Sequence, residues 1–348
     1  MKVINAISGS VEGIFSEILN SLTEDQLVVL DTLDAMLFGI KDQSSIRSFL
    51  QLLYGSVKGK SSSLIMIAEG TNPAVEQLKF VSDAIISLSF DSVLEEEVRV
   101  LKVIKDRDYE IENNKVYFTL SNGLQLLYPV DYSVRRYIKR LNYIRKGSAA
   151  EHSNLLKLGG TVLVEIDENV PNIIVRQYMY FSLLNDLLKG YRVNLLFPPD
   201  ESEETILDDL QVAGGLLKNV KIFHPDAEAV NYDPDRFIDQ IRENIFLENA
   251  VDYVDLLTEE NFAVSKPESF EAFLRKILEI NSKRNSIAHA YGYGNMVSTK
   301  LEKKYVKIHR KLAIVNGLLM SRSIRPFGKL EFIRMDPEAG EMEFIKMK

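Results

Sequence analysis

The sequence predicts an α/β fold in which largely parallel strands are covered by helices on both faces. Short apolar runs alternate with stretches of helical periodicity, a pattern typical of such sheets. The chain has 348 residues, of which 46% are hydrophobic, and this is longer than one core usually supports. The order of predicted elements from residue 251 onward also repeats the order from 27 to 128. Two domains related by an internal duplication are therefore expected.

The first domain is expected to span residues 1–132. Its apolar runs predict strands, and the residues between them predict helices because apolar side chains recur at helical spacing. The strands are expected at 27–33, 63–68 and 84–90, with helices at 44–57 and 72–83. Pro73 suits the first turn of the second helix. Ahead of these, the sequence predicts a strand at 3–7 and a helix at 11–22.

The end of this domain changes to a strand-by-strand pattern. Residues 96–111, 114–122 and 123–130 predict an antiparallel β-meander, with turns at Glu112 to Asn114 and at Asn122-Gly123. A basic stretch follows, with Lys or Arg at 135, 136, 139, 140, 145 and 146, and predicts a connecting helix over 133–150. A solvated helix face is favoured for it over a docking site.

The second domain is expected over 151–348. A Gly-Gly turn precedes a strand ending at Asp167, and a helix at 172–190 is stopped by Gly190. The remaining predicted elements are strands at 191–199, 251–259, 286–292, 311–320, 328–335 and 341–347, and a helix at 268–284.

Composition excludes several classes of function. The net charge of −8 disfavours a broad nucleic-acid or membrane surface. The chain has no Cys and four His, at 152, 224, 289 and 309, so disulfides and thiolate zinc sites are excluded and other metal chemistry is not expected. No long apolar segment or signal-peptide pattern is found, and we expect a cytoplasmic protein.

A nucleotide site would need a phosphate-binding loop. The signature G-x-x-x-x-G-K-[ST] is absent from the chain. Between the first strand and helix of the second domain, Asp167 to Asn172 read DENVPN, with two acids and neither Gly nor Lys. These acids repel a polyphosphate, and no flexible glycine backbone is present. In the first domain, the residues before Leu27 leave no room for the loop. We therefore expect no ATP hydrolysis by this chain alone.

Three residues are candidate nucleotide contacts. Asp31 ends a predicted strand, where a carboxylate could hold magnesium-bound water or could cap the following segment. Lys105 and Arg107 form a K-x-R pair that could reach a neighbouring subunit's γ-phosphate, as an arginine finger does. The alternative for the pair is a set of exposed edge-strand charges.

A histidine and two tyrosines near residue 290 are further candidate site residues. His289 lies in an apolar run, where a core histidine is favoured over a catalytic one. Tyr291 and Tyr293 could stack on a base, but they more often mark a half-buried strand end.

Several segments resemble known proteins. Residues 28–36, 63–90 and 100–108 look like the later part of a KaiC-type RecA-superfamily domain. Within that superfamily the tandem arrangement is most similar to the archaeal gas-vesicle regulatory protein D family, on the basis of residues 159–178, 193–202 and 314–333. The resemblance implies two RecA-like three-layer domains with the fold of P-loop nucleoside triphosphatases, each ending in an antiparallel meander. The first, 1–132, is N-terminally truncated and lacks the Walker A region, and the second, 151–348, is degenerate.

The resemblance implies a regulatory or scaffold protein that acts through protein partners. Asp31, Lys105 and Arg107 are then vestigial or trans-acting nucleotide positions. No cofactor is expected for this chain alone, whereas ATP and magnesium fit an oligomer or a longer protein, and a homo-oligomer fits the fold. Two alternatives stay open: a KaiC-like ATPase shortened by gene annotation, and a recombinase-like DNA binder relying on the basic segment 135–146.

Overall fold

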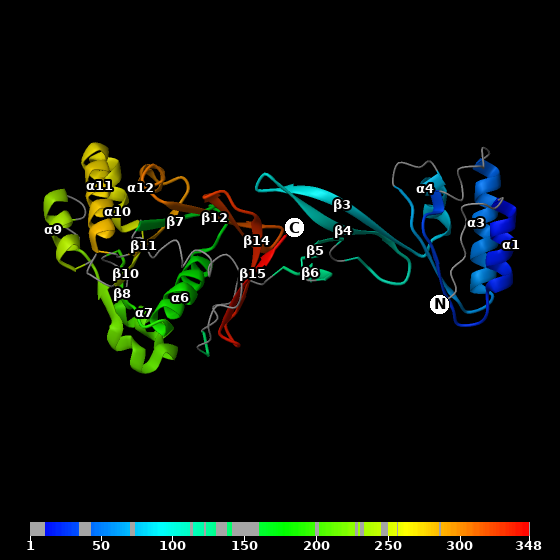
Figure 1. Ribbon diagram of the computed structural model, residues 1–348, viewed down its shortest axis with the longest axis horizontal. Helices are drawn as coiled ribbons and strands as arrows, with labels where there is room; N and C mark the ends of the chain where they lie inside the picture. Colours follow the sequence, from blue (N-terminus) through cyan, green and yellow to red (C-terminus); the bar gives the residue numbers. More distant parts are fainter. Residues whose placement is uncertain are drawn as a thin grey trace. The chain divides into compact units, whose positions relative to one another are not determined.

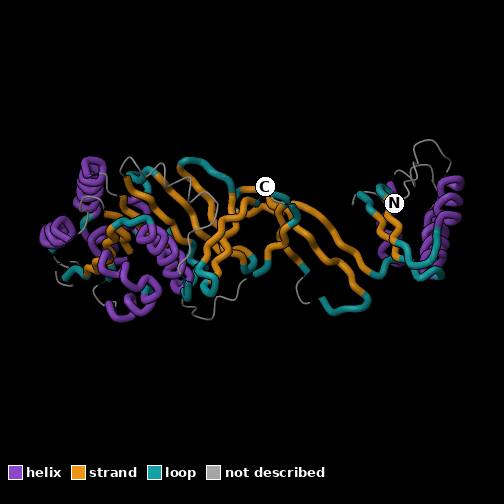
Figure 2. Tube along the Cα trace, turned by 60° about the horizontal axis from the view of Figure 1, so that its bottom comes forward, coloured by secondary structure: helices purple, strands orange, loops and turns teal. Residues whose placement is uncertain are grey.

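The computed structural model describes residues 11–34, 43–69, 74–111, 114–121, 123–129, 138–140, 160–198, 202–226, 229, 233–244, 250–255, 257–284 and 287–347. It confirms a mixed α/β protein with large sheets (Figure 1 and Figure 2). The chain divides into two compact units: residues 1–87 with 102–115, and residues 88–101 with 116–348. No described helix has the length and apolar character needed to cross a bilayer.

The first unit contains a small parallel sheet with helices on one face. Strands β1 and β2 pair in parallel, with Leu27 opposite Ser63. Helices α1 and α3 pack on this sheet through a core that includes Ile18, Leu30 and Leu53. The elements are α1 (Val11–Ser21), β1 (Leu27–Leu30), α3 (Gln43–Lys58), β2 (Ser63–Met66) and α4 (Ala74–Val81), close to the ranges that the sequence predicts.

A four-stranded meander follows α4, and its strands contribute residues to both units. The strands pair in the order β3 (Ala84–Val93), β4 (Glu96–Asp106), β5 (Lys115–Thr119) and β6 (Gln125–Leu127). The meander is confirmed, but the run at 84–90 was expected beside β1 and β2 and instead pairs with β4. The reason is a tight turn at Leu94 and Glu95, both with positive φ, that leads β3 directly into β4. Arg322 donates to the Leu94 carbonyl and pairs with Glu95 at 2.9 Å, which holds this strained turn.

The second unit is built on a nine-stranded sheet of order β15-β14-β13-β12-β7-β11-β10-β8-β9. The six strands from β12 to β9 in this order are parallel, and β12 to β15 are antiparallel to one another. The strands are β7 (Gly160–Ile166), β8 (Arg192–Leu196), β9 (Val220–Phe223), β10 (Ala250–Asp255), β11 (Ile287–Tyr293), β12 (Ile308–Val315), β13 (Leu318–Arg325), β14 (Leu330–Asp336) and β15 (Glu341–Lys346).

Helices cover both faces of the parallel part of this sheet, which gives three layers (Figure 1). One face carries α6 (Asn172–Leu188), α7 (Glu203–Asp209) and the 3-10 segment η2 (Gln211–Asn219). The other carries α9 (Pro234–Asn244), α10 (Leu257–Ser265), α11 (Pro267–Arg284) and α12 (Val297–Glu302). Helix α6 is apolar on most sides, so it lies deep in its core, and it stops at Gly190, whose φ is 86°.

Two predicted strands end earlier than expected. The run 311–320 is two strands, because Asn316-Gly317 adopts positive φ at both residues and forms a hairpin turn between β12 and β13. The run 251–259 ends at Asp255, and Leu257 already begins α10. No element was predicted over residues 203–244, where the structure has α7, η2, β9 and α9.

Some predictions fall on residues outside the described ranges. They are the strand at 3–7, Pro73, the turn residues 112, 113 and 122, and most of the connecting helix 133–150. Of that helix, only Ile138 to Arg140 are described, and these three residues are not helical. The boundaries 1–132 and 151–348 remain predictions.

The predicted repeat of element order is present, and it extends to strand register. Each element of the first set lies 224 residues, within a few positions, before its counterpart: α1 and α9, β1 and β10, α3 and α11, β2 and β11, α4 and α12, β3 and β12. Leu27 pairs with Ser63 and Val251 pairs with Ile287, so partners lie 36 residues apart in both sheets. Among the described residues, β7, α6 and β8 have no counterpart in the first set.

Candidate functional site

Asp31 lies where the sequence predicts, directly after β1 at the carboxyl end of the small sheet. Its side chain is exposed. Asp34 and Glu69 lie at the same sheet edge, since the Glu69 amide donates to the Asp34 carboxylate at 2.8 Å. The Leu33 amide donates to the Ile67 carbonyl at 2.7 Å, which joins the segments after β1 and β2. Acidic side chains therefore line this edge.

Lys105 and Arg107 are both bonded to the end of α4. The Lys105 ammonium donates to the carbonyls of Lys79 and Ser82 at 2.8 and 2.7 Å. The Arg107 guanidinium donates to the Phe80 carbonyl at 2.9 Å and to the Asp83 carboxylate at 3.0 Å. The last carbonyls of a helix have no partner within it, and cations at that end also interact favourably with the helix dipole. The K-x-R pair therefore caps α4.

The second unit repeats this arrangement with one arginine. Arg325, on β13, donates to the carbonyls of Lys303 and Val306 at 3.3 and 2.9 Å, at the end of α12. Within the described part of the chain, Asp31 shares no hydrogen bond or ion pair with Lys105 or Arg107. The structure therefore does not bring the three predicted nucleotide contacts together within one unit.

The loop that follows β7 occupies the place expected for a phosphate loop in the second unit. Its amides are used within the protein: Asp167 N–H donates to the Leu312 carbonyl at 2.9 Å, and Val170 N–H donates to the Asp167 carbonyl at 3.0 Å. Val170 is buried, and its carbonyl accepts a bond from the Tyr293 hydroxyl at 3.3 Å. The Asp167 and Val170 amides of this loop are therefore directed at acceptors within the chain.

Asn169 fastens the same loop to β12. Its side-chain amide donates to the Ile314 carbonyl at 2.6 Å and accepts from the Ile314 amide at 3.2 Å. Lys311 on β12 lies 3.5 Å from the Asp167 carboxylate. The two acids noted in the sequence therefore differ in role: Asp167 is paired, whereas Glu168 is exposed.

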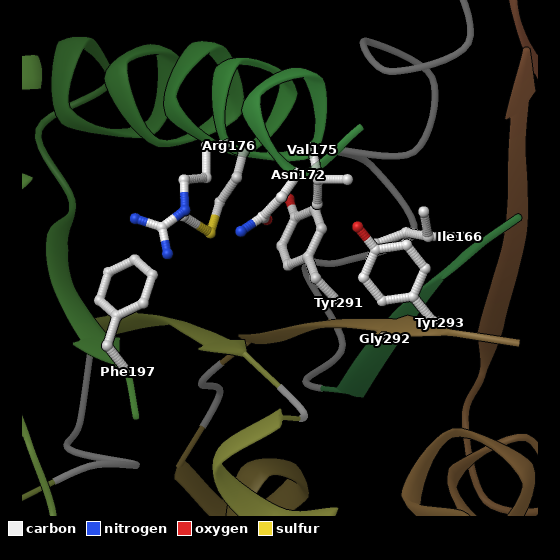
Figure 3. Close-up of a pocket in the computed structure, with 9 residues that line it drawn as sticks. Ile166, Asn172, Val175, Arg176, Phe197, Tyr291, Gly292 and Tyr293 are labelled. Atoms are coloured by element: carbon white, nitrogen blue, oxygen red, sulfur yellow. The ribbon is translucent and has the colours of Figure 1, made fainter. Parts of the chain in front are cut away.

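A small pocket opens beside this loop, between the start of α6 and the ends of β8 and β11 (Figure 3). Arg176 reaches from α6 toward Phe197, and its guanidinium carbon lies 5.6 Å from the centre of that ring. Tyr291 and Tyr293 approach from β11. The free volume is about 20 Å³, room for about one water molecule, so a nucleotide does not fit in this conformation.

The opposite face of β7 carries a nearly buried ion-pair network. Glu165 accepts from His309 Nε2 at 2.6 Å, on neighbouring β12, and from the Lys303 ammonium at 2.7 Å, after α12. Burial alone would raise the pKa of Glu165, but the hydrogen bonds from His309 and Lys303 outweigh it and lower the pKa to about 2. These contacts tie β7 to both β12 and the end of α12.

Two further carboxylates lie at α12. Glu260, from α10, accepts from the amides of Val297 and Ser298 at 2.9 Å each, so it caps the amino end of α12. Glu302 is buried, its Oε2 atom has no hydrogen-bond partner, and burial raises its pKa to about 8. Sequence reasoning missed Glu165, Glu260 and Glu302, because single acids at unremarkable spacing carry no signal of burial.

His289 is a core residue, as the sequence favours. Its ring stacks on Tyr253 with centroids 4.9 Å apart, and burial lowers its pKa. Tyr291 is buried against Tyr178, whereas Tyr293 is half-buried at the strand end and lines the pocket. No described group of three or more His, Asp or Glu side chains could hold a metal ion.

The first part of the chain matches a known protein family. Residues 5–129 match the family model described as ATPase: KaiC. This match supports KaiC-like RecA-superfamily membership for the first part of the chain, and the mixed α/β architecture is consistent with a RecA-like fold. It extends through the four-stranded meander and includes Asp31, Lys105 and Arg107. None of the curated proteins matches the chain.

Proposed function

We propose that this protein is a RecA-superfamily regulator or scaffold that acts in the cytoplasm through protein contacts and does not hydrolyse ATP with its own residues. The observation that carries the proposal is the loop after β7, whose Asp167 and Val170 amides donate within the chain. A phosphate cradle needs such amides directed at the ligand. The similarity to the gas-vesicle regulatory protein D family and the two degenerate RecA-like halves are part of this proposal.

The first unit supports the same proposal. Lys105 and Arg107 already donate to carbonyls at the end of α4, so reaching a phosphate would break bonds that cap this helix. The acidic net charge of −8 leaves DNA binding without support.

The test is an isothermal titration of the full chain with ATP and Mg²⁺. We expect no heat of binding and no phosphate release in a parallel turnover assay. ADP and the buffer alone serve as controls. Micromolar affinity for ATP, abolished by ADP competition, would contradict the proposal.

A second candidate follows from the family match. Residues 5–129 resemble a KaiC ATPase, so ATP could be held between copies of the chain or with residues supplied from elsewhere. In that case ATP would promote assembly, and Lys105→Ala with Arg107→Ala would abolish turnover. Sedimentation velocity with and without ATP separates the candidates, because the first expects no ATP-dependent change in mass.

A further inference from the structure

One face of the small parallel sheet in the first unit is apolar and uncovered. Leu27 and Val29 on β1 are 62% and 50% exposed, and Ile65 and Ile67, in and after β2, are 49% and 45% exposed. The opposite face, with Leu30 and its neighbours, is buried by α1 and α3. Parallel strands are normally covered on both faces. An apolar patch of this kind marks an interaction site.

The second unit shows what covers the equivalent face. By the 224-residue repeat, Leu27, Val29 and Ile67 correspond to Val251, Tyr253 and Tyr291, which are 1%, 1% and 3% exposed. These residues belong to the core that α6 closes. The missing cover is therefore a helix placed like α6.

Among the residues that the structure describes, no strand pairs with β2 on the side away from β1. In the second unit β11 pairs in parallel with β7, the strand that leads into α6. In the first unit β2, the counterpart of β11, pairs with β1, and the sheet has two strands among the described residues. A free strand edge accepts an added strand through backbone hydrogen bonds. The edge of β2 would accept one added strand, and the exposed apolar face of β1 and β2 would accept the helix that follows that strand.

The charged side chains at the carboxyl edge of the sheet indicate which residue types the loop between that strand and helix would carry. In the second unit the β7–α6 loop lies at the carboxyl edge of the sheet, where it is acidic and Asp167 pairs with Lys311. At the corresponding edge of the first unit, the exposed charged side chains among the described residues are acidic, Asp31 and Glu69. An acidic loop would be repelled there, whereas a loop with Lys or Arg would be attracted.

We infer that β1 and β2 form a docking site for a strand-loop-helix segment of another polypeptide, with a basic loop and an apolar helix stripe. Its strand extends the sheet beside β2, and its helix covers Leu27, Val29, Ile65 and Ile67. This contact goes beyond the proposed function, because it holds whether or not ATP binds.

The probe is a peptide that copies residues 159–190 of this chain, carried on a soluble protein. These residues form the covering segment of the second unit. One version carries Asp167→Lys and Glu168→Lys, and the matched control keeps the acidic loop. We expect the basic version to bind the full chain about tenfold more tightly in low salt, with the difference shrinking as salt rises. Hydrogen exchange should slow at the amides of β2.

Variants of the chain locate the contact. Val29→Lys should weaken binding about tenfold or more, because a buried charge has no partner under the helix. Ile67→Lys is the second variant, and Val264→Lys, at a side chain 57% exposed on α10, is the matched control with no expected effect. Circular dichroism checks that each variant is folded.

Three outcomes overturn the inference. The first is that neither peptide binds, and the second is that Val29→Lys and Ile67→Lys leave binding unchanged. The third is self-association of the chain alone that Val29→Lys abolishes, which assigns the face to a second copy. The ATP titration contains no peptide, so either proposal can fail without the other.

Discussion

The sheet face of β10 and β11 and the sheet face of β1 and β2 share element order and register but differ in burial. Tyr253 is 1% exposed, whereas Val29 at the equivalent position is 50% exposed. The difference traces to β7 and α6, which complete the second sheet and have no described counterpart in the first. A repeated element order therefore does not by itself give a repeated core.

The helices α4 and α12, which are equivalent in the two regions, are capped at their carboxyl ends in the same way. Lys105 and Arg107 bond the last carbonyls of α4, and Arg325 does the same at the end of α12. In both regions a cation at the end of the second hairpin strand thus bonds the end of the helix that precedes the hairpin. This shared geometry favours a structural role for the K-x-R pair within the chain.

The largest expected difference between the two regions is in the free energy of unfolding lost when equivalent leucines on α3 and α11 are truncated. Leu50 and Leu274 are 2% and 4% exposed. We expect Leu274→Ala to lower the free energy of unfolding by about 3–5 kcal/mol and Leu50→Ala by about 2–3 kcal/mol, because the half-covered sheet can relax into the cavity. Urea unfolding followed by circular dichroism measures both. Leu52→Ala, at an exposed position on α3, is the control. An equal or larger cost for Leu50→Ala would contradict this view of the first unit.

The ion pairs of Glu165 with His309 and Lys303, which hold β7, should make the free energy of unfolding depend on pH. The pKa of Glu165 is lowered from 4.5 to about 2 in the folded protein, so its contribution is present above pH 4.5 and is lost as the pH falls toward 2. This amounts to about 3 kcal/mol. Glu165→Gln should destabilise the protein by about 2–3 kcal/mol at pH 7 and remove that part of the acid dependence.

Urea unfolding at pH 3 and pH 6 measures this contribution. The described residues of the first unit include no equivalent of Glu165, so hydrogen exchange in α3 should respond less to the substitution than exchange in β7. An unchanged difference between the two pH values in Glu165→Gln would show that the network does not control the acid response.

The smallest expected effects concern the helix ends. Arg107→Ala and Arg325→Ala should each cost about 1 kcal/mol, since each leaves helix carbonyls without a donor. The costs should add in the double variant, because the two sites share no partner. Thermal unfolding of both single variants and the double variant tests this. A loss of folding in either one would mean that the contacts do more than cap a helix.

The sequence by itself determined the class of fold and much of the element order. The strands β1, β2 and β7 and the helices α3, α6 and α11 follow from local periodicity and from stop signals such as Gly190. The core position of His289 and the absence of a glycine-rich loop also follow from local residues. Periodicity reports which face of an element is apolar, and that information is local.

Only the tertiary structure decided which apolar faces are covered and which charges meet. Nothing near Leu27 or Val251 in the sequence tells that one is 62% exposed and the other 1% exposed. Likewise Glu165 meets His309 and Lys303 from more than a hundred residues away, and Lys105 finds the end of α4 instead of a phosphate. Burial and pairing depend on the elements that arrive from elsewhere in the chain, and the pattern of one segment does not encode them.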